Sequence, residues 1–202
     1  MSILIAIKSG NAVYIAGDRE VSKDGVSASS VRRVWRTSGS GGILVGCIAP
    51  THIVSHFKNV HLFDGSYFSR DDFNYGFMRI PMCYRIMHEF EHHIRQDESN
   101  CNNDSDGCEI NAQFLFARGG SLYSIDQVLN AIEVDDFIAL GAGSSYAFES
   151  LLNTVEEFDP IVRIKNAVLE CKKRGVHIDF PIEIHNTTKS GDVITLHKKD
   201  FE

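Results

Sequence analysis

The chain has 202 residues, of which 43% are hydrophobic and 23% are charged; this composition is typical of one globular domain and excludes a mostly disordered chain. Acidic residues outnumber basic residues 27 to 20, giving a net charge of −7. Such a chain repels phosphate backbones, so we expect no nucleic-acid partner. No stretch of about 18 apolar residues occurs, so the sequence offers no helix that could span a membrane.

The N-terminus and the five cysteines indicate the compartment. The first residues carry neither a basic segment nor a long apolar core, so they do not resemble a secretory signal peptide. The cysteines are odd in number and irregularly spaced, which makes a poor disulfide framework. We therefore expect reduced thiols in a cytoplasmic protein, folded as a single domain over residues 1–202, with no cofactor and no metal.

The first 50 residues predict four short apolar strands, at 2–8, 12–16, 31–36 and 43–48. Ser9-Gly10-Asn11 supplies the turn of a first hairpin. Gly17-Asp18-Arg19 is expected to end the second strand. Glycines between the third and fourth strands predict a second hairpin.

In the middle of the chain the spacing of apolar residues changes from that of strands to that of helices. Apolar residues at helical spacing predict two helices, at 51–63 and 81–96. The segment 96–109 is polar and acidic and contains no Lys or Arg, which predicts a loop insertion in the domain. Strands are expected to resume at 112–117, 122–125 and 136–140.

Two helices and two strands are expected to complete the chain, at 144–155, 160–174, 182–185 and 193–197. Pro160 stands in a first helical turn, where proline is favoured, and Gly175 follows a helix end, where glycine is favoured. Strands alternating with helix pairs predict two antiparallel sheets packed face to face, with helices outside. The predicted fold class is α/β (α+β), a four-layer α/β/β/α sandwich.

Four motifs in chain order resemble the proteasome β-subunit family, most closely its bacterial branch, the HslV peptidase. The motifs are the strand end Ile15-Ala16-Gly17-Asp18, the V-R-K-V-like Val31-Arg32-Arg33-Val34, the glycine-bearing Leu44-Val45-Gly46-Cys47, and the segment 139–147, which is similar to A-I-G-S-G-x-x-Y-A. The resemblance runs from Ser2 to about Phe180. It implies the N-terminal nucleophile hydrolase fold.

The resemblance also implies a mechanism. The hydroxyl of the first mature residue attacks a peptide carbonyl, and its own α-amine, with a pKa of about 7.7–8.0, takes the proton. Carried over to this sequence, Ser2 is the nucleophile once Met1 is removed. Arg33 is the cation beside the amine, and Asp18 orients that cation. Gly46 is the oxyanion donor.

Three positions depart from the family pattern. Ser2 replaces threonine and loses the methyl group that fixes the rotamer. Arg33 replaces lysine, and its planar guanidinium differs from a point ammonium. Ala142 replaces a serine that in the family helps to hold the α-amine. Two interpretations therefore stand: an active serine-type peptidase, and a catalytically inactive homologue that keeps the fold and the assembly.

The partners that the resemblance implies are identical subunits in a ring that encloses the sites, an ATPase unfoldase that feeds the ring, and a polypeptide substrate. No membrane partner is expected. The resemblance assigns no function to the acidic insertion at 96–109.

A second motif points to a different chemistry. His88-Glu89-Phe90-Glu91-His92 fits H-E-x-x-H, in which two histidines one helical turn apart bind zinc and the glutamate activates a zinc-bound water. Glu109 or a distant histidine would be the third ligand of such a zinc metallopeptidase. The apolar residues of 81–96 share the other helix face, so a solvated polar face also explains the pattern.

Overall fold

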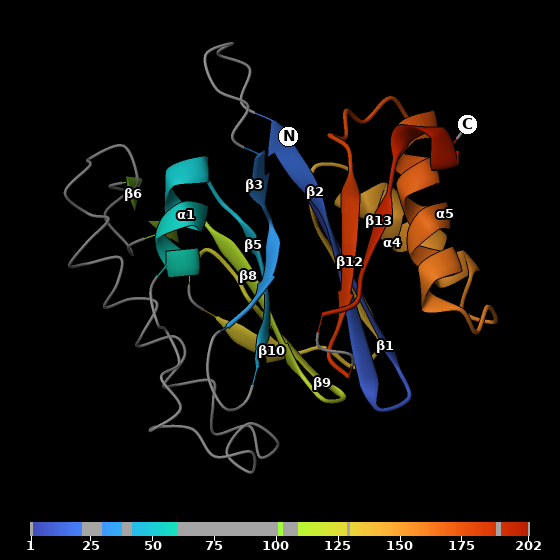
Figure 1. The fold of residues 1–202 in the computed structure, drawn as a ribbon, viewed down its shortest axis with the longest axis horizontal. Helices are drawn as coiled ribbons and strands as arrows, with labels where there is room; N and C mark the ends of the chain where they lie inside the picture. The colour runs from blue at the N-terminus through green and yellow to red at the C-terminus, as the bar shows by residue number, and fades with distance from the viewer. Residues whose placement is uncertain are drawn as a thin grey trace.

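The structure is a computed structural model, and it describes seven stretches of the chain: 2–21, 30–37, 42–59, 101–102, 109–128, 130–188 and 191–201. Two antiparallel sheets lie face to face with helices on their outer sides (Figure 1). The expected four-layer sandwich is therefore confirmed in its two sheets and in helices on both outer faces.

The first sheet contains six strands in the order β11-β1-β2-β12-β13, with β3 paired to the far end of β2. The bounds are β1 Ile3–Ser9, β2 Ala12–Val21, β3 Ser30–Arg32, β11 Phe137–Gly141, β12 Ile182–Asn186 and β13 Val193–Leu196. The central pair, β1 and β2, is the predicted hairpin, and Gly10 takes the positive φ of +58° that its tight turn requires.

The second sheet contains five strands in the order β10-β9-β8-β5-β4. The bounds are β4 Val34–Arg36, β5 Leu44–Ile48, β8 Gln113–Arg118, β9 Ser121–Ile125 and β10 Ala131–Glu133. A separate two-stranded ladder joins β6 Cys101–Asn102 to β7 Glu109–Ile110, within the segment predicted to be a loop insertion.

Helices cover the outer face of each sheet. The bounds are α1 Thr51–Asn59, α4 Ser144–Asn153, α5 Pro160–Lys173 and the short 3-10 helix η3 Lys198–Phe201. The start of α5 is capped by the Asp159 side chain, which accepts a hydrogen bond from the Ile161 N–H, and Pro160 occupies the first turn as predicted. Gly175, just after α5, has φ +79°, as a helix-ending glycine should.

Strand β1 is buried on both faces, which explains its unbroken apolar run. Ile3, Ile5 and Ile7 pack toward α4 and α5, whereas Leu4 and Ala6 pack between the two sheets. A strand with two buried faces gains nothing from alternating polarity. A third cluster of buried residues lies between the second sheet and α1, around Phe57, Phe114 and Phe116.

Two expectations about the strands were wrong. The segment Gly17-Asp18-Arg19 does not end β2, because Asp18 pairs with Ile182 of β12 and Arg19 pairs with Arg32 of β3. These partners lie far away in sequence and extend the strand beyond its local pattern. The single strand expected at 31–36 is divided into β3 and β4 at Arg33, whose side chain turns into the interior.

Two predicted helical segments lie wholly or partly outside the described residues. Helix α1 covers 51–59 of the predicted 51–63, and the predicted helix at 81–96 falls entirely outside. Among the helices that the structure does describe, none has both the length and the apolar character needed to cross a bilayer.

Candidate active site

Ser2 lies at the entrance of β1 and is held through its main chain. The Ala142 N–H donates a hydrogen bond of 2.8 Å to the Ser2 carbonyl oxygen. Gly141, the residue before Ala142, has φ +86°, and a β-carbon at Gly141 would lie 2.3 Å from the Ser2 carbonyl oxygen. Only glycine fits such a contact. The end of β11 therefore fixes the position of Ser2.

Asp18 is almost fully enclosed, with 1% of its surface exposed. Its Oδ1 accepts a hydrogen bond of 3.1 Å from the N–H of Ile3, the residue after Ser2. Among the described residues, none donates a hydrogen bond to its Oδ2. Burial raises the pKa of Asp18 to about 7, even though the Ile3 hydrogen bond and the charge of Arg33 both lower it. Asp18 is thus a carboxyl group poised to change charge near neutral pH.

Arg33 lies where β3 gives way to β4 and is 4% exposed. Its Nη1 donates a 2.5 Å hydrogen bond to the Ala49 carbonyl, just beyond the end of β5. Its own carbonyl accepts a 2.9 Å hydrogen bond from the Cys47 N–H. Because its charge lowers the pKa of Asp18, its guanidinium supplies a cation to the surroundings of that carboxylate.

Gly46 lies inside β5, opposite Val34 on one side and Leu115 on the other. A β-carbon at Gly46 would lie 3.2 Å from the Leu4 side chain of the facing sheet. The glycine therefore lets the two sheets approach closely. The next N–H along the strand, that of Cys47, is engaged by the Arg33 carbonyl.

The strand registers bring the four predicted site residues to one end of the sandwich. Leu4 of β1 pairs with Gly17 of β2, which places the start of β1 beside Asp18. Val34, next to Arg33, pairs with Gly46. The structure thus gathers these residues around the gap between the sheets, while their chemical roles remain predictions.

Sequence reasoning assigned no role to two further groups at this end. Asp179, in the loop before β12, raises the pKa of Asp18 through its negative charge, and its Oδ1 lies 3.2 Å from His177 Nε2. Cys47 is fully buried, and burial raises the pKa of its thiol although Arg33 opposes that rise. Asp179 has no local signal, since it reaches the site through the pairing of β12 with β2. Cys47 stands in the glycine-bearing motif directly after Gly46, but the motif gives its thiol no role.

A second buried carboxylate lies next to Asp18 in the sheet. Glu183 of β12 pairs with Gly17, and its oxygens lie 3.4 Å from Arg19 Nε and 3.5 Å from Arg32 Nε. His185 Nε2 lies 4.0 Å from Glu183 Oε2. The His185 side chain, followed by the two guanidiniums, holds the pKa of Glu183 below its usual value of 4.5. This carboxylate therefore stays charged, in contrast to Asp18.

The zinc motif His88-Glu89-x-x-His92 lies outside the described residues, as does the side chain of Glu109. Within the described stretches, no three His, Cys, Asp or Glu side chains are grouped so that they could hold a metal ion. The zinc hypothesis is therefore neither supported nor opposed by the geometry.

No family model matches the sequence, and no curated protein matches it. Solved structures, however, match along nearly the whole chain. The BPH of Thiobacillus denitrificans, also solved in complex with epoxomicin, is 14% identical with a TM-score of 0.65, covering 95% of this chain and 100% of that one. The helical assembly of the Anbu (ancestral beta-subunit) complex from Pseudomonas aeruginosa is 16% identical with a TM-score of 0.66, covering 98% and 88%.

A eukaryotic HslV, from Trypanosoma brucei, is 13% identical with a TM-score of 0.58, covering 91% of this chain and 98% of that one. The chain has the proteasome-like fold. The expectation that HslV would be the most similar branch is not supported, because BPH and Anbu match with higher TM-scores. At these identities the likeness concerns the fold, and the activity has to be argued from the residues.

Proposed function

We propose that the protein is a subunit of a self-compartmentalised peptidase that cleaves peptide bonds with Ser2 as an N-terminal nucleophile, after Met1 is removed. The observation that carries this proposal is the hydrogen bond from the Ile3 N–H to the buried Asp18, with the Arg33 cation nearby. A buried carboxyl group of raised pKa beside a specific cation is a common mark of a functional site.

In this mechanism Ser2 Oγ attacks the substrate carbonyl carbon, and the Ser2 α-amine accepts the hydroxyl proton. A positive charge near the amine lowers its pKa and keeps it unprotonated; Arg33 supplies that charge. Asp18 balances it in its ionised form, which dominates above its pKa of about 7. The oxyanion that forms needs a main-chain donor, which we assign to Gly46. The amine then returns the proton to the leaving group, and water releases the acyl-enzyme.

A catalytically inactive homologue is the second candidate, and two contacts favour it. The Arg33 guanidinium is bonded to the Ala49 carbonyl, and the Cys47 N–H beside Gly46 is taken by the Arg33 carbonyl. Both groups are therefore engaged within the protein. In this alternative the chain contributes its fold and its surface to an assembly without cleaving peptides.

Mass spectrometry and an active-site reagent separate the two candidates. The active subunit is expected to lose Met1, to react at one site with an electrophile that targets hydroxyl nucleophiles, and to lose that reaction in Ser2→Ala. Epoxomicin, which BPH binds, should compete with the reagent. Ser144→Ala, which changes a serine at the start of α4, is the matched control. Retention of Met1 in every molecule would refute the Ser2 mechanism.

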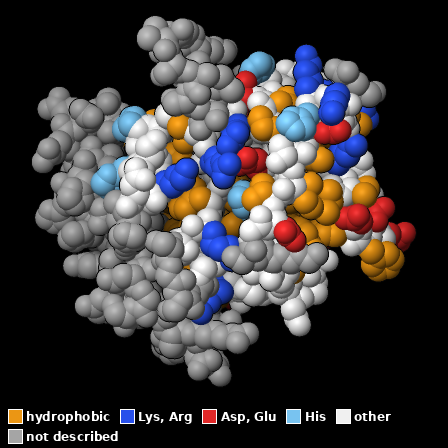
Figure 2. Space-filling model, in the orientation of Figure 1, with side chains coloured by type: hydrophobic (Ala, Val, Ile, Leu, Met, Phe, Trp, Pro, Cys, Tyr) orange, Lys and Arg blue, Asp and Glu red, His pale blue; other side chains and the backbone are white. Residues whose placement is uncertain are grey.

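We also assign the protein to a homo-oligomer, a ring that encloses the sites and takes substrate from an ATPase unfoldase. Support comes from apolar side chains exposed on and just after α4: Leu152, Val155 and Phe158, the last 94% exposed. Figure 2 shows hydrophobic side chains reaching the surface on the side where α4 and α5 lie. Light scattering tests the assembly, and Phe158→Asp should lower the measured mass; a monomer in the wild type would contradict it.

A further inference from the structure

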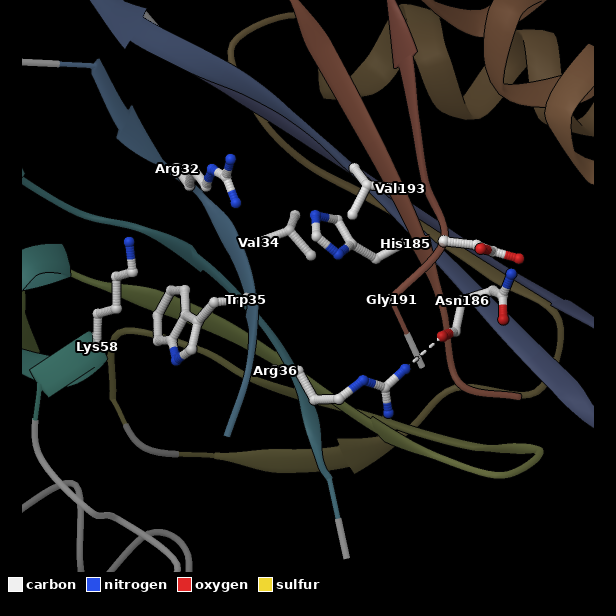
Figure 3. Close-up of a pocket in the computed structure, with 10 residues that line it drawn as sticks. Arg32, Val34, Trp35, Arg36, Lys58, His185, Asn186, Gly191 and Val193 are labelled. Carbon is white, nitrogen blue, oxygen red and sulfur yellow. Dashed lines mark hydrogen bonds between the residues drawn. The ribbon is translucent and has the colours of Figure 1, made fainter. Parts of the chain in front are cut away.

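A cavity of about 350 Å³ opens at the edge of the sandwich, between β4 of one sheet and the β12–β13 hairpin of the other (Figure 3). The C-terminal end of α1 borders it through Lys58. This volume is at the lower end of the range for small-molecule sites. The strand edges form its walls, so its shape is set by the sheets themselves.

Cationic side chains from three elements line this cavity: Arg32, Arg36 and Lys58. Arg36 spans it: its Nη1 donates a hydrogen bond of 2.7 Å to the Gly42 carbonyl. Its Nη2 donates a hydrogen bond of 2.5 Å to the Asn186 carbonyl (Figure 3). Both acceptors are neutral, so the charge of Arg36 is held in place without being cancelled. Within the described stretches, no carboxylate forms an ion pair with Arg36 or Lys58.

The charges around the cavity do not balance. Glu183, beside it, is shared between Arg19 and Arg32. Asp192 is the one acidic residue among the described residues that line the cavity. Among the described residues, the cations Arg19, Arg32, Arg36 and Lys58 and these two carboxylates leave a surplus of two positive charges. The net charge of the whole chain is −7. Figure 2 shows Lys, Arg and His side chains gathered along the middle of this face.

Apolar groups form the rest of the wall. Trp35 and Val34 border the cavity from β4, and Val193 borders it from β13. The His185 ring lies between Val34 and the β12 backbone in Figure 3. A ligand here would meet cations at one part of its surface and an indole ring and two valines at another. Few convergent polar groups on an apolar wall are typical of small-molecule sites.

We propose that this cavity binds a small phosphate monoester, with its phosphate between Arg32 and Lys58 and its organic part against Trp35. A phosphate monoester carries about −1.5 to −2 charges at pH 7, which matches the surplus of two. Guanidinium groups bind phosphate oxygens with charge-assisted, often bidentate hydrogen bonds. The proposal does not depend on the peptidase function, because none of these side chains takes part in that mechanism.

Phenyl phosphate is the probe that tests this proposal on the full chain. The protein has one tryptophan, Trp35, so its fluorescence reports occupancy of the cavity directly, and calorimetry gives the stoichiometry and the dissociation constant. We expect saturable binding of one phenyl phosphate per chain with a change in Trp35 emission. Benzoate, a monoanion of similar shape, should bind more weakly.

Lys58→Gln isolates the charge contribution, because Lys58 pairs with no described carboxylate and the change should leave the fold intact. Loss of one charge-assisted hydrogen bond should weaken phenyl phosphate binding about tenfold or more. Lys199→Gln, in the exposed η3, removes the same charge at a distance and should not change the affinity.

Three results would overturn the proposal. The first is the absence of saturable phenyl phosphate binding to the wild type. The second is an equal loss of affinity in Lys58→Gln and Lys199→Gln, which would indicate diffuse charge attraction only. The third is binding of benzoate as tight as that of phenyl phosphate, which would refute the choice of a dianionic head group.

Discussion

Two buried carboxylates lie on neighbouring strands of the same sheet and behave in opposite ways. Asp18 is 1% exposed and Glu183 is 5% exposed, yet the pKa of Asp18 is raised to about 7 and that of Glu183 is lowered. Glu183 has two guanidiniums within 3.5 Å, whereas Asp18 has one N–H and a more distant cation. Burial alone therefore does not decide the charge of a carboxylate; for Glu183 the His185 side chain, followed by the two guanidiniums, outweighs it.

This difference in pKa also separates the energetic roles of the two carboxylates. A carboxylate that is neutralised by close cations holds strands together and resists titration. A carboxylate that lacks them stores an electrostatic cost, and it can respond to a charge that arrives beside it. The ability to respond to an arriving charge suits a reacting site. Substitutions that alter the surroundings of one carboxylate at a time test this difference.

The largest effect is expected on the Asp18 side, from Gly141→Ala. The added methyl group would overlap the Ser2 carbonyl oxygen at a residue with φ +86°, so the start of β1, which donates the Ile3 hydrogen bond to Asp18, must shift. We expect a loss of about 3 kcal/mol or more in the free energy of unfolding, measured by urea denaturation.

Gly119→Ala is the matched control for that change. Gly119 also has a positive φ, +56°, but nothing lies within 4 Å of its added β-carbon. It should lose only about 1 kcal/mol, from the backbone conformation alone. Equal losses in the two variants would show that the contact with Ser2 is unimportant.

On the other side, Glu183→Gln leaves Arg19, Arg32 and His185 around an uncharged amide. Breaking a buried ion pair costs about 3–5 kcal/mol, and we expect about 2 kcal/mol here, because water screens the partly exposed arginines. Urea denaturation measures the loss. Glu170→Gln, which removes ion pairs from the exposed surface of α5, should shift the midpoint less.

The pH dependence of stability should distinguish the two carboxylates by sign. Between pH 4 and 7 folded Asp18 holds a proton that the unfolded chain has lost, so its contribution is present below pH 3.8 and falls as the pH rises to about 7. Asp18→Asn should remove this fall and gain on the order of 1 kcal/mol at pH 8. Asp135→Asn, at an exposed position, should leave the fall in stability between pH 4 and 7 unchanged.

Glu183 contributes in the opposite sense. Its folded pKa lies below 4.5, so its stabilisation is present above pH 4.5 and is lost as the pH falls through the folded pKa. Glu183→Gln should therefore flatten the acid side of the stability profile and leave the fall between pH 4 and 7. A wild-type profile without that fall would contradict the raised pKa of Asp18.

The smallest effect is expected from Arg32→Lys. The side chain of Arg32 is 46% exposed, and its Nε lies 3.5 Å from Glu183. Lysine keeps the charge but loses the planar fork, so the cost should be below about 1 kcal/mol and should shrink further in high salt. A larger loss would mean that Arg32, rather than Arg19, holds the charge of Glu183.

Local sequence pattern predicted most of the fold because many elements carry their own signals. The turn at Gly10, Pro160 at the start of α5 and Gly175 after its end lie where turn and cap chemistry place them. The prediction that β2 ends at Gly17-Asp18-Arg19 was wrong, because pairing with β12 and β3 extends β2 through these residues. Pairing across the chain cannot be read from neighbouring residues.

The candidate site was predictable only where a motif existed. Asp18, Arg33 and Gly46 each stand in a recognisable short motif, and Ser2 was assigned from its position in the first strand of the resemblance. The registers of the strands bring these residues together. Asp179 and Glu183 had no such motif. Their influence on the site depends on β12 lying beside β2, and this contact joins opposite ends of the chain.

The hydrogen bond from Ala142 to the Ser2 carbonyl has a consequence for how the site can vary. It anchors the second residue through a group that every amino acid possesses. The side chain at position 2 is thus open to exchange without loss of backbone placement. Threonine or cysteine there would present a different attacking atom from the same point in space, so nucleophile chemistry and chain geometry can change independently in this protein.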